Sequence, residues 1–264
     1  MKENDIFRNM LANERSFDRL FCDCVNYEFF TACFSASFTD DPVFSHIIIE
    51  DTVTTLVNPA SVLEQIITDS LNTAKRLNFP VSIFVDKYLP WSEKFEKIAI
   101  DLGLRISERM NLLSKTVETV SATRGDVKCE ITTDADMWNE VFMNSYKIPE
   151  SWREELLARE KSFVQDSKTL LLLAREKGVE SKPSGCLLIH NEPKDWAGIY
   201  CVGTLPEKRH RGIAREMLLT AESLAQERGC RFLTLQTIES DGVTPMYQKL
   251  GYKVEFQRDI LQMK

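Results

Sequence analysis

Apolar and polar side chains alternate along this chain with two different periods, which predicts a mixture of helices and strands. From Pro59 onward, apolar side chains recur every three or four residues, so this segment is predicted to form a helix packed on a core. A second strong helical pattern begins after Gly212 and ends at Gly229. Short apolar runs bounded by Gly, Pro, Asn or Asp predict the strands.

The order of these elements divides the chain into two stretches. The first is predicted to hold helices up to about residue 22, from residue 59 and over 92–102, with strands near 27–36, 44–50, 81–85 and 104–115. The second is predicted to hold strands near 127–132, 169–175, 186–190, 197–204 and 231–238 and after Gly251, with helices over 134–146, 150–163, 213–229 and near 245–250. Residues 118–126 are small and polar, which predicts a linker between a domain at 1–117 and a domain at 127–264.

The two stretches resemble each other. Residues 102–106 (Leu-Gly-Leu-Arg-Ile) match residues 250–254 (Leu-Gly-Tyr-Lys-Val) in character, and each set ends a predicted helix and begins a predicted strand. Either such corners recur by chance, or the first stretch is a degenerate second copy of the same fold. Residues 1–102 contain no glycine, so the first stretch cannot form a glycine-based phosphate loop.

The charge of the chain argues against a nucleic-acid partner. The 264 residues carry a formal net charge of −7, and residues 1–120 hold 12 basic and 18 acidic side chains, or −6 of that total. No run approaches ~18 consecutive apolar residues, and no secretory leader opens the sequence, so we expect a cytoplasmic protein without a membrane partner. Seven cysteines are spread without a metal-binding rhythm, so no metal is expected.

The richest local chemistry lies in residues 199–214, where an apolar strand runs into a cationic turn and then a helix. Small residues there let backbone N–H groups approach an anion, and the helix directs its positive dipole end at the same point. The turn holds no Gly-x-x-x-x-Gly-Lys-Ser/Thr run and no Gly-x-Gly-x-x-Gly run, which excludes the loops of nucleotide hydrolases and dinucleotide enzymes. A small anionic cofactor therefore suits this cation cluster.

What remains is Arg209-x-x-Gly212-x-Ala214, which resembles the acetyl-CoA loop (Gln/Arg-x-x-Gly-x-Gly/Ala) of the GNAT superfamily of N-acetyltransferases. The element order over residues 127–264 also resembles a GNAT domain. The resemblance implies an α/β (α+β) fold with a mixed, mostly antiparallel central sheet flanked by helices, and two GNAT-like halves if the first stretch is a degenerate copy.

The same resemblance implies the reaction and its residues. Acetyl-CoA would be the co-substrate, and its acetyl group would pass to a primary amine by direct attack in a ternary complex. Val202 and Thr204, with Gly203 between them, would bind the pantetheine arm through backbone groups. Tyr247, in a segment similar to the family's Pro-Leu-Tyr-x-Lys/Arg-Leu-Gly-Phe, would contact the cofactor and act as general acid on the thiolate. The residues implied for the pyrophosphate are Arg209, His210, Arg211, Gly212, Ile213 and Ala214.

The general base is not identified by the sequence. Some family members carry an acidic residue about eleven positions before the loop, which here falls on Gly198. Its absence favours an acceptor amine of low pKa, such as an α-amine, or deprotonation through water. The candidates are Glu239, Ser240 and Tyr200, although Glu239 also fits the polar end of a strand.

Two other classes of function remain open. The chain could be a non-catalytic acyl-CoA sensor that uses the same loop, or an interaction protein whose first half is the working part. An intact Tyr247 favours catalysis over sensing. The acceptor could be a small molecule or a peptide, and whether the chain forms a homodimer is left open.

Overall fold

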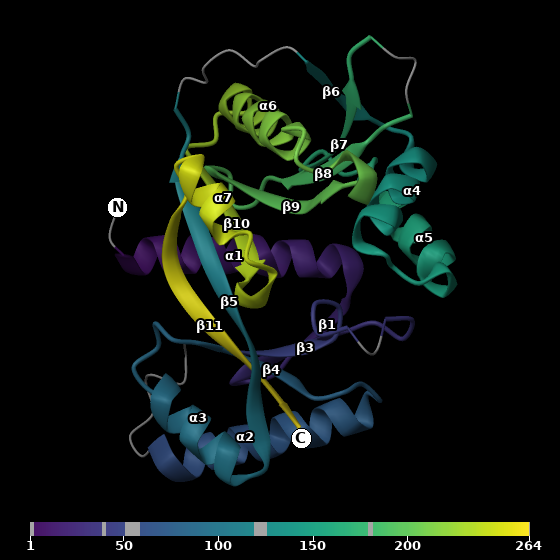
Figure 1. Cartoon of the computed structure of the whole chain (residues 1–264). Helices are drawn as coiled ribbons and strands as arrows, with labels where there is room; N and C mark the ends of the chain where they lie inside the picture. The colour runs from purple at the N-terminus through teal and green to yellow at the C-terminus, as the bar shows by residue number, and fades with distance from the viewer. Residues whose placement is uncertain (1–2, 39–40, 51–58, 119–125, 179–181, 264) are drawn as a thin grey trace. The chain divides into compact units, whose positions relative to one another are not determined.

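The computed structural model describes residues 3–38, 41–50, 59–118, 126–178 and 182–263 (Figure 1). Most of the predicted linker at 118–126 lies outside these described residues. The chain packs into two compact units: unit 1 comprises Met1–Leu20 and Ser114–Leu235, and unit 2 comprises Phe21–Leu113 and Gln236–Lys264. Packing therefore groups the first helix with the second half of the chain and the last strand with the first half. The domain boundaries at 117 and 127 follow from the predicted duplication of one fold, and they stay a prediction.

Unit 1 contains a mixed, mostly antiparallel sheet with the strand order β10-β9-β8-β7-β6. Only β10 and β9 run parallel, and α6 forms the crossover between them. The other neighbouring strands are antiparallel. Its elements are α1 (Glu3–Phe21), β6 (Val127–Thr132), α4 (Ala135–Tyr146), α5 (Arg153–Phe163), β7 (Thr169–Glu176), β8 (Gly185–His190), β9 (Trp196–Thr204), α6 (Ile213–Glu227) and the first part of β10 (Phe232–Ile238).

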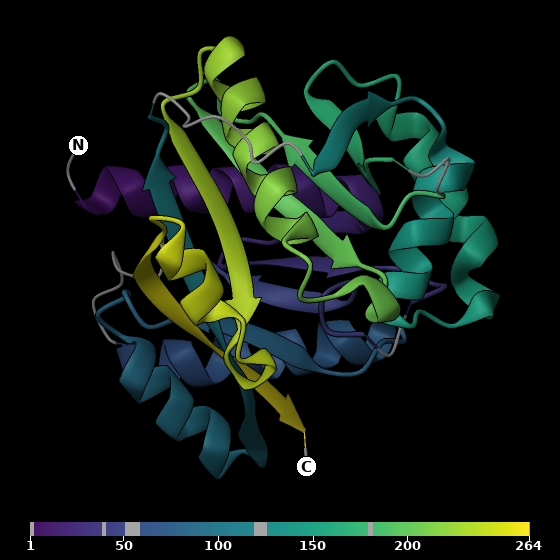
Figure 2. The same ribbon diagram turned by 45° about the horizontal axis from the view of Figure 1, so that its top comes forward.

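Helices cover both faces of the unit 1 sheet, and Figure 2 shows α6 lying along its strands. A Cβ atom on Gly185 would meet Ile213 of α6 at 2.8 Å, whereas a Cβ atom on Gly203 would meet Ser145 of α4 at 2.8 Å. Gly203 pairs with Cys186, the neighbour of Gly185, and neighbouring side chains on a strand point to opposite faces. The helices α4 and α6 therefore lie on opposite faces of the sheet.

The first helix of the chain, α1, packs with unit 1 through buried polar and aromatic side chains. Asn13 donates hydrogen bonds to the carbonyl oxygens of His190 at 3.0 Å and Glu192 at 2.5 Å. The ring of Phe17 stacks on Tyr200 of β9, with centroids 3.5 Å apart. These contacts bring α1 against the strands β8 and β9, some 180 residues later in the sequence.

Unit 2 contains parallel and antiparallel strands in the order β1-β2-β3-β4-β11-β5. Its antiparallel strands β1, β2 and β3 lead through α2 to β4, which runs parallel to β3. The same connection joins β7, β8 and β9 through α6 to β10, as the similarity between the two stretches predicts. The elements are β1 (Asp23–Asn26), β2 (Phe30–Phe34), β3 (His46–Ile49), α2 (Pro59–Arg76), β4 (Ser82–Asp86), α3 (Ser92–Asp101), β5 (Leu104–Thr116, which continues into unit 1), α7 (Thr244–Lys249) and β11 (Lys253–Met263).

A buried ion pair joins the strands β11 and β4. Arg258 donates from Nε to Asp86 at 2.8 Å, and neither side chain is exposed to solvent. The guanidinium also lies over the ring of Phe84, 5.2 Å from its centroid. Removal of one partner would leave an uncompensated buried charge, so this pair favours the pairing of β11 with β4.

Candidate functional site

A β-bulge interrupts β9 at the position where the sequence predicts pantetheine binding. Cys186 pairs with Gly203 and Leu188 with Tyr200, so two residues of β9, Cys201 and Val202, stand opposite the single residue between the partners on β8. Cys201 has φ 52°, which is rare for a residue with a side chain. Such a bulge leaves backbone groups outside the ladder of strand pairing, where a ligand can use them.

The loop after the bulge forms an anion site at the start of α6. His210 and Gly212 both have positive φ, and Gly212 is the N-cap residue with nothing within 4 Å of an added Cβ. The first helical hydrogen bond runs from the N–H of Glu216 to the carbonyl of Gly212 at 3.0 Å. Within the described residues, the backbone N–H groups of Gly212, Ile213 and Ala214 donate to no protein acceptor. These free donors and the helix dipole favour a phosphate group.

The cations of the loop are already engaged. Lys208 lies 2.5 Å from Glu176 at the end of β7, and Arg211 lies 3.0 Å from the same carboxylate, which holds the pKa of Glu176 below its usual value. Arg209 donates to the carbonyls of Ser145 at 2.9 Å and Thr204 at 3.3 Å. Its guanidinium therefore connects α4 to β9 as well as carrying charge at the loop.

The C-terminal end of α4 is held against the bulge. The hydroxyl of Tyr146 donates to the carbonyl of Val202 at 3.0 Å, although the residue is half exposed. Ser145 lies where a side chain on Gly203 would be. Sequence analysis missed both helix residues, because α4 presents no motif and the contacts span some 56 positions along the chain.

Tyr247 lies on α7 in unit 2. Its ring is buried and packs edge-on against Tyr252, with centroids 5.9 Å apart. Burial raises the pKa of Tyr247 to about 12, so its hydroxyl keeps its proton at neutral pH. That hydroxyl has no hydrogen-bond partner among the described residues.

The predicted base candidates in unit 2 have partners. Glu239 pairs with Arg109 at 3.7 Å, and its carboxylate is half exposed. The hydroxyl of Ser240 donates to Glu108, and this hydrogen bond lowers the pKa of that carboxyl. A role as general base stays a prediction for both residues.

The third candidate, Tyr200, donates its hydroxyl to Asn13 at 2.6 Å. Sequence analysis looked for an acidic residue at position 198 of β9, where the chain has glycine. The structure explains why this position holds no side chain. A Cβ atom on Gly198 would lie 1.9 Å from the side-chain oxygen of Asn13 and 2.3 Å from the Tyr200 ring. The helix α1 thus occupies the space that a side chain at position 198 would need.

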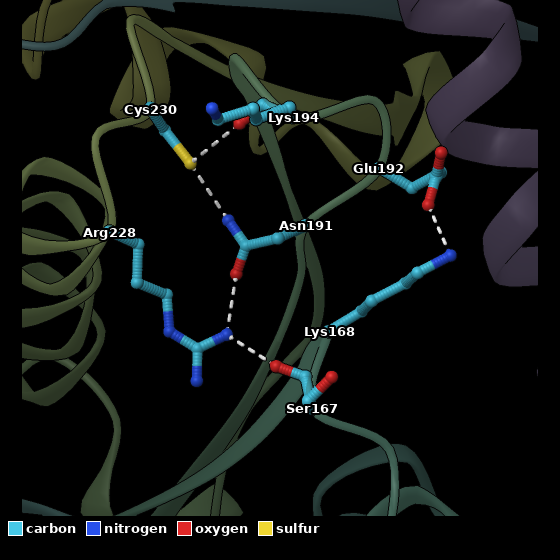
Figure 3. Close-up of a pocket in the computed structure, with 7 residues that line it drawn as sticks. All are labelled: Ser167, Lys168, Asn191, Glu192, Lys194, Arg228 and Cys230. Carbon is cyan, nitrogen blue, oxygen red and sulfur yellow. Dashed lines mark hydrogen bonds and ion pairs between the residues drawn. The ribbon is translucent and has the colours of Figure 1, made fainter.

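A separate pocket of about 440 Å³ lies at the other end of α6, roughly 22 Å along the helix from the loop (Figure 3). Arg228 donates to the Ser167 carbonyl and to Asn191, whose amide donates to the Cys230 sulfur. Lys168 pairs with Glu192. The polar groups of this pocket thus bond to one another, and it contains no predicted site residue.

Comparison with known proteins finds a family match over part of the chain. Residues 135–252 match the model of the acetyltransferase (GNAT) family. The chain contains a GNAT domain. The matched segment includes the β9 bulge, the loop before α6 and Tyr247. No curated protein matches the sequence.

Solved structures share the fold over almost the whole chain. A GCN5-related N-acetyltransferase from Kribbella flavida is similar with a TM-score of 0.70 and 14% identity, covering 97% of this chain and 94% of that one. A GCN5-related N-acetyltransferase from Sphaerobacter thermophilus also has a TM-score of 0.70 and 14% identity, covering 96% and 89%. The predicted mixed, mostly antiparallel GNAT fold is confirmed, and the family and fold support acyl transfer. Within the described residues, no helix is both long and apolar enough to span a membrane.

Proposed function

We propose that the chain is an N-acetyltransferase that moves an acetyl group from acetyl-CoA to a primary amine by direct attack in a ternary complex. The observation that carries this proposal is the bulge of β9 followed directly by free backbone donors at the start of α6. The donors at Gly212, Ile213 and Ala214 suit the pyrophosphate of CoA. The bulge at Val202 suits the amides of the pantetheine arm, with Thr204 as the next contact.

The cations near the loop would add charge-assisted hydrogen bonds to the pyrophosphate. Arg211 is more than half exposed at its side chain and can leave Glu176 when a stronger anion arrives. Arg209 would act partly by holding α4 to β9. His210 is exposed, and its backbone lies in the left-handed region immediately before the free donors.

Tyr247 is the proposed general acid. Its phenol remains protonated at neutral pH, so it can donate to the CoA thiolate as the C–S bond breaks. The identity of the acceptor amine and the cytoplasmic location stay predictions. A sensor would bind CoA without turnover, so release of free thiol from acetyl-CoA with a panel of amines, amino acids and peptides separates the two functions.

Charge reversal in the loop should weaken CoA binding. The double variant Arg209→Glu, Arg211→Glu should lose roughly tenfold to over a hundredfold in CoA affinity, since a charge-assisted hydrogen bond contributes about 1.5–3 kcal/mol. Isothermal titration with CoA measures this change. The single variant Arg211→Glu separates phosphate binding from the contact between Arg209 and α4. Arg228→Glu, beyond the end of α6, is the matched control, and unchanged affinity in the double variant would refute the assignment.

Removal of the carboxylate that holds two of the cations should have the opposite effect. Glu176→Gln should bind CoA about two- to fivefold more tightly, because Lys208 and Arg211 no longer have a competing anion. The gain should shrink as salt screens the charges. Glu130→Gln, at a carboxylate paired with Arg175, controls for the change in net charge. Weaker CoA binding by Glu176→Gln would show that Glu176 positions the cations instead.

A further inference from the structure

A buried carboxyl group lies on α5, on the side of the helix that faces the protein interior. Glu160 has no exposed surface, and neither carboxylate oxygen makes a hydrogen bond of normal geometry among the described residues, although the Asn139 side chain lies close enough to lower the pKa of Glu160. Leu156 and Phe163 are buried on the same side of the helix, at the spacing that places three side chains on one face. The sequence therefore builds Glu160 into an otherwise apolar face.

Two further polar groups from α4 are buried and make no hydrogen bond of normal geometry among the described residues. They are the amide nitrogen of Asn139 and the hydroxyl of Ser145. The side-chain oxygen of Asn139 accepts a hydrogen bond from Arg153 at 3.2 Å. Buried polar atoms are nearly always hydrogen-bonded, and each that is not costs stability. Unsatisfied polar atoms on the two packed helices α4 and α5 point to a function that uses them.

One of these polar groups, the Ser145 hydroxyl, lies beside the bulge of β9. A Cβ atom on Gly203 would lie 2.8 Å from Ser145 and 2.9 Å from the sulfur of Cys186. Cys186 donates to the carbonyl of Cys201, within the bulge, at 3.6 Å. The carboxylate of Glu160 is near enough to both thiols to raise the pKa of each, in addition to the larger effect of burial.

We propose that Glu160 accepts the proton of the acceptor amine through water hydrogen-bonded to Asn139 and Ser145. This inference rests on the proposed acetyltransferase function and supplies the base that β9 lacks. The amine nitrogen bonds to the acetyl carbon, the C–S bond breaks with its electrons on sulfur, and the N–H proton passes through water to the Glu160 carboxylate. Exchange with solvent then returns Glu160 to its ionised form.

The transfer of the amine proton through water to Glu160 is called the relay below. The groups around Glu160 set the pH at which this relay can act. The pKa of Glu160 is raised to about 8: burial raises it most and Asp136 also raises it, whereas the Asn139 amide and the charge of Arg153 lower it. From the sheet, the thiols of Cys186 and Cys201 are close enough to interact electrostatically with Glu160. The carboxylate fraction therefore increases as the pH rises toward 8, and kcat/KM should increase with it.

Glu160→Gln tests the relay with the full chain and the acceptor found in the thiol-release screen. We expect kcat/KM above pH 8 to fall about 10²–10⁴-fold and the acid limb near pH 8 to disappear, with unchanged CoA affinity. The acceptor amine can also titrate within the pH profile of kcat/KM. Its pKa is therefore measured without protein, which separates its ionisation from that of Glu160. Glu155→Gln, at a partly exposed carboxylate on the same helix that pairs with Arg159, should behave as wild type.

A second variant tests the relay if Glu160→Gln does not bind CoA. Arg153→Gln removes a partly exposed charge that lowers the pKa of Glu160, so the acid limb should move to higher pH. Arg159→Gln, which loses an ion pair with Glu155, should leave the limb in place. An unchanged profile in Glu160→Gln, or in Arg153→Gln where the first variant fails to fold, overturns the relay alone. A wild-type chain that releases no CoA with any amine overturns the proposed function and the relay together.

Discussion

Tyr247→Phe should bind CoA as the wild-type chain does and transfer acetyl groups about 10²–10⁴-fold more slowly, the usual contribution of a general acid. The substitution removes one hydroxyl group and leaves the ring packed against Tyr252. Because the hydroxyl has no hydrogen-bond partner among the described residues, its loss should not disturb the surrounding structure. The effect should therefore appear in kcat and leave the CoA affinity unchanged.

The pKa of Tyr247 sets the form of this result. Burial raises it to about 12, so Tyr247 stays protonated across the pH range of an ordinary assay. When kcat is plotted against pH, the variant should thus show a lower plateau than wild type. Its alkaline limb should not be displaced. Tyr252→Phe removes a hydroxyl from the neighbouring ring and should leave the rate unchanged. If Tyr247→Phe matches wild type at every pH while chemistry limits the rate, Tyr247 only packs and the acid lies elsewhere.

Local patterns were enough to predict most of the helices and strands. The helix from Pro59, the strand before the loop and the helix after it all lie within a few residues of their predicted bounds, because apolar periodicity records which face is buried. The short strand β1 was missed. Most of its residues are exposed or half exposed, so no apolar alternation marks it.

Contacts between distant parts of the chain were not predictable in the same way. The bulge of β9 depends on its register with β8, and no local pattern specifies a register. The space beside Gly198 is occupied by Asn13, some 185 residues away along the sequence. The absence of an acidic residue on β9 was visible from the sequence, but its cause required the position of α1.

Glu160 left a signal that sequence analysis did not use. The segment from Arg153 to Phe163 carries so many charges that it resembles a solvated helix. Glu160 nevertheless follows Leu156 by four positions and precedes Phe163 by three, which places it on the apolar face. The spacing of residues alone therefore makes a single carboxyl group on the apolar side of a helix a candidate for a shifted pKa.

The same carboxyl should make the stability of the wild-type chain depend on pH. The unfolded chain releases the Glu160 proton near pH 4.5, whereas the folded chain holds it to about pH 8. Between these values the folded state binds more protons, so the free energy of unfolding falls as the pH rises. At about 1.4 kcal/mol per pH unit, the loss attributable to Glu160 is roughly 3–5 kcal/mol over this interval.

Glu160→Gln should abolish this loss, because glutamine does not titrate. The difference in the free energy of unfolding between variant and wild type should therefore widen from pH 4.5 to pH 8 and stay constant above it. Urea denaturation at several pH values measures the difference, and Glu155→Gln should run parallel to wild type. Parallel curves for Glu160→Gln and wild type would show that Glu160 is ionised in the folded chain at neutral pH. A widening gap would show that the chain keeps a carboxyl group whose burial lowers its stability, which is what a group retained for proton transfer predicts.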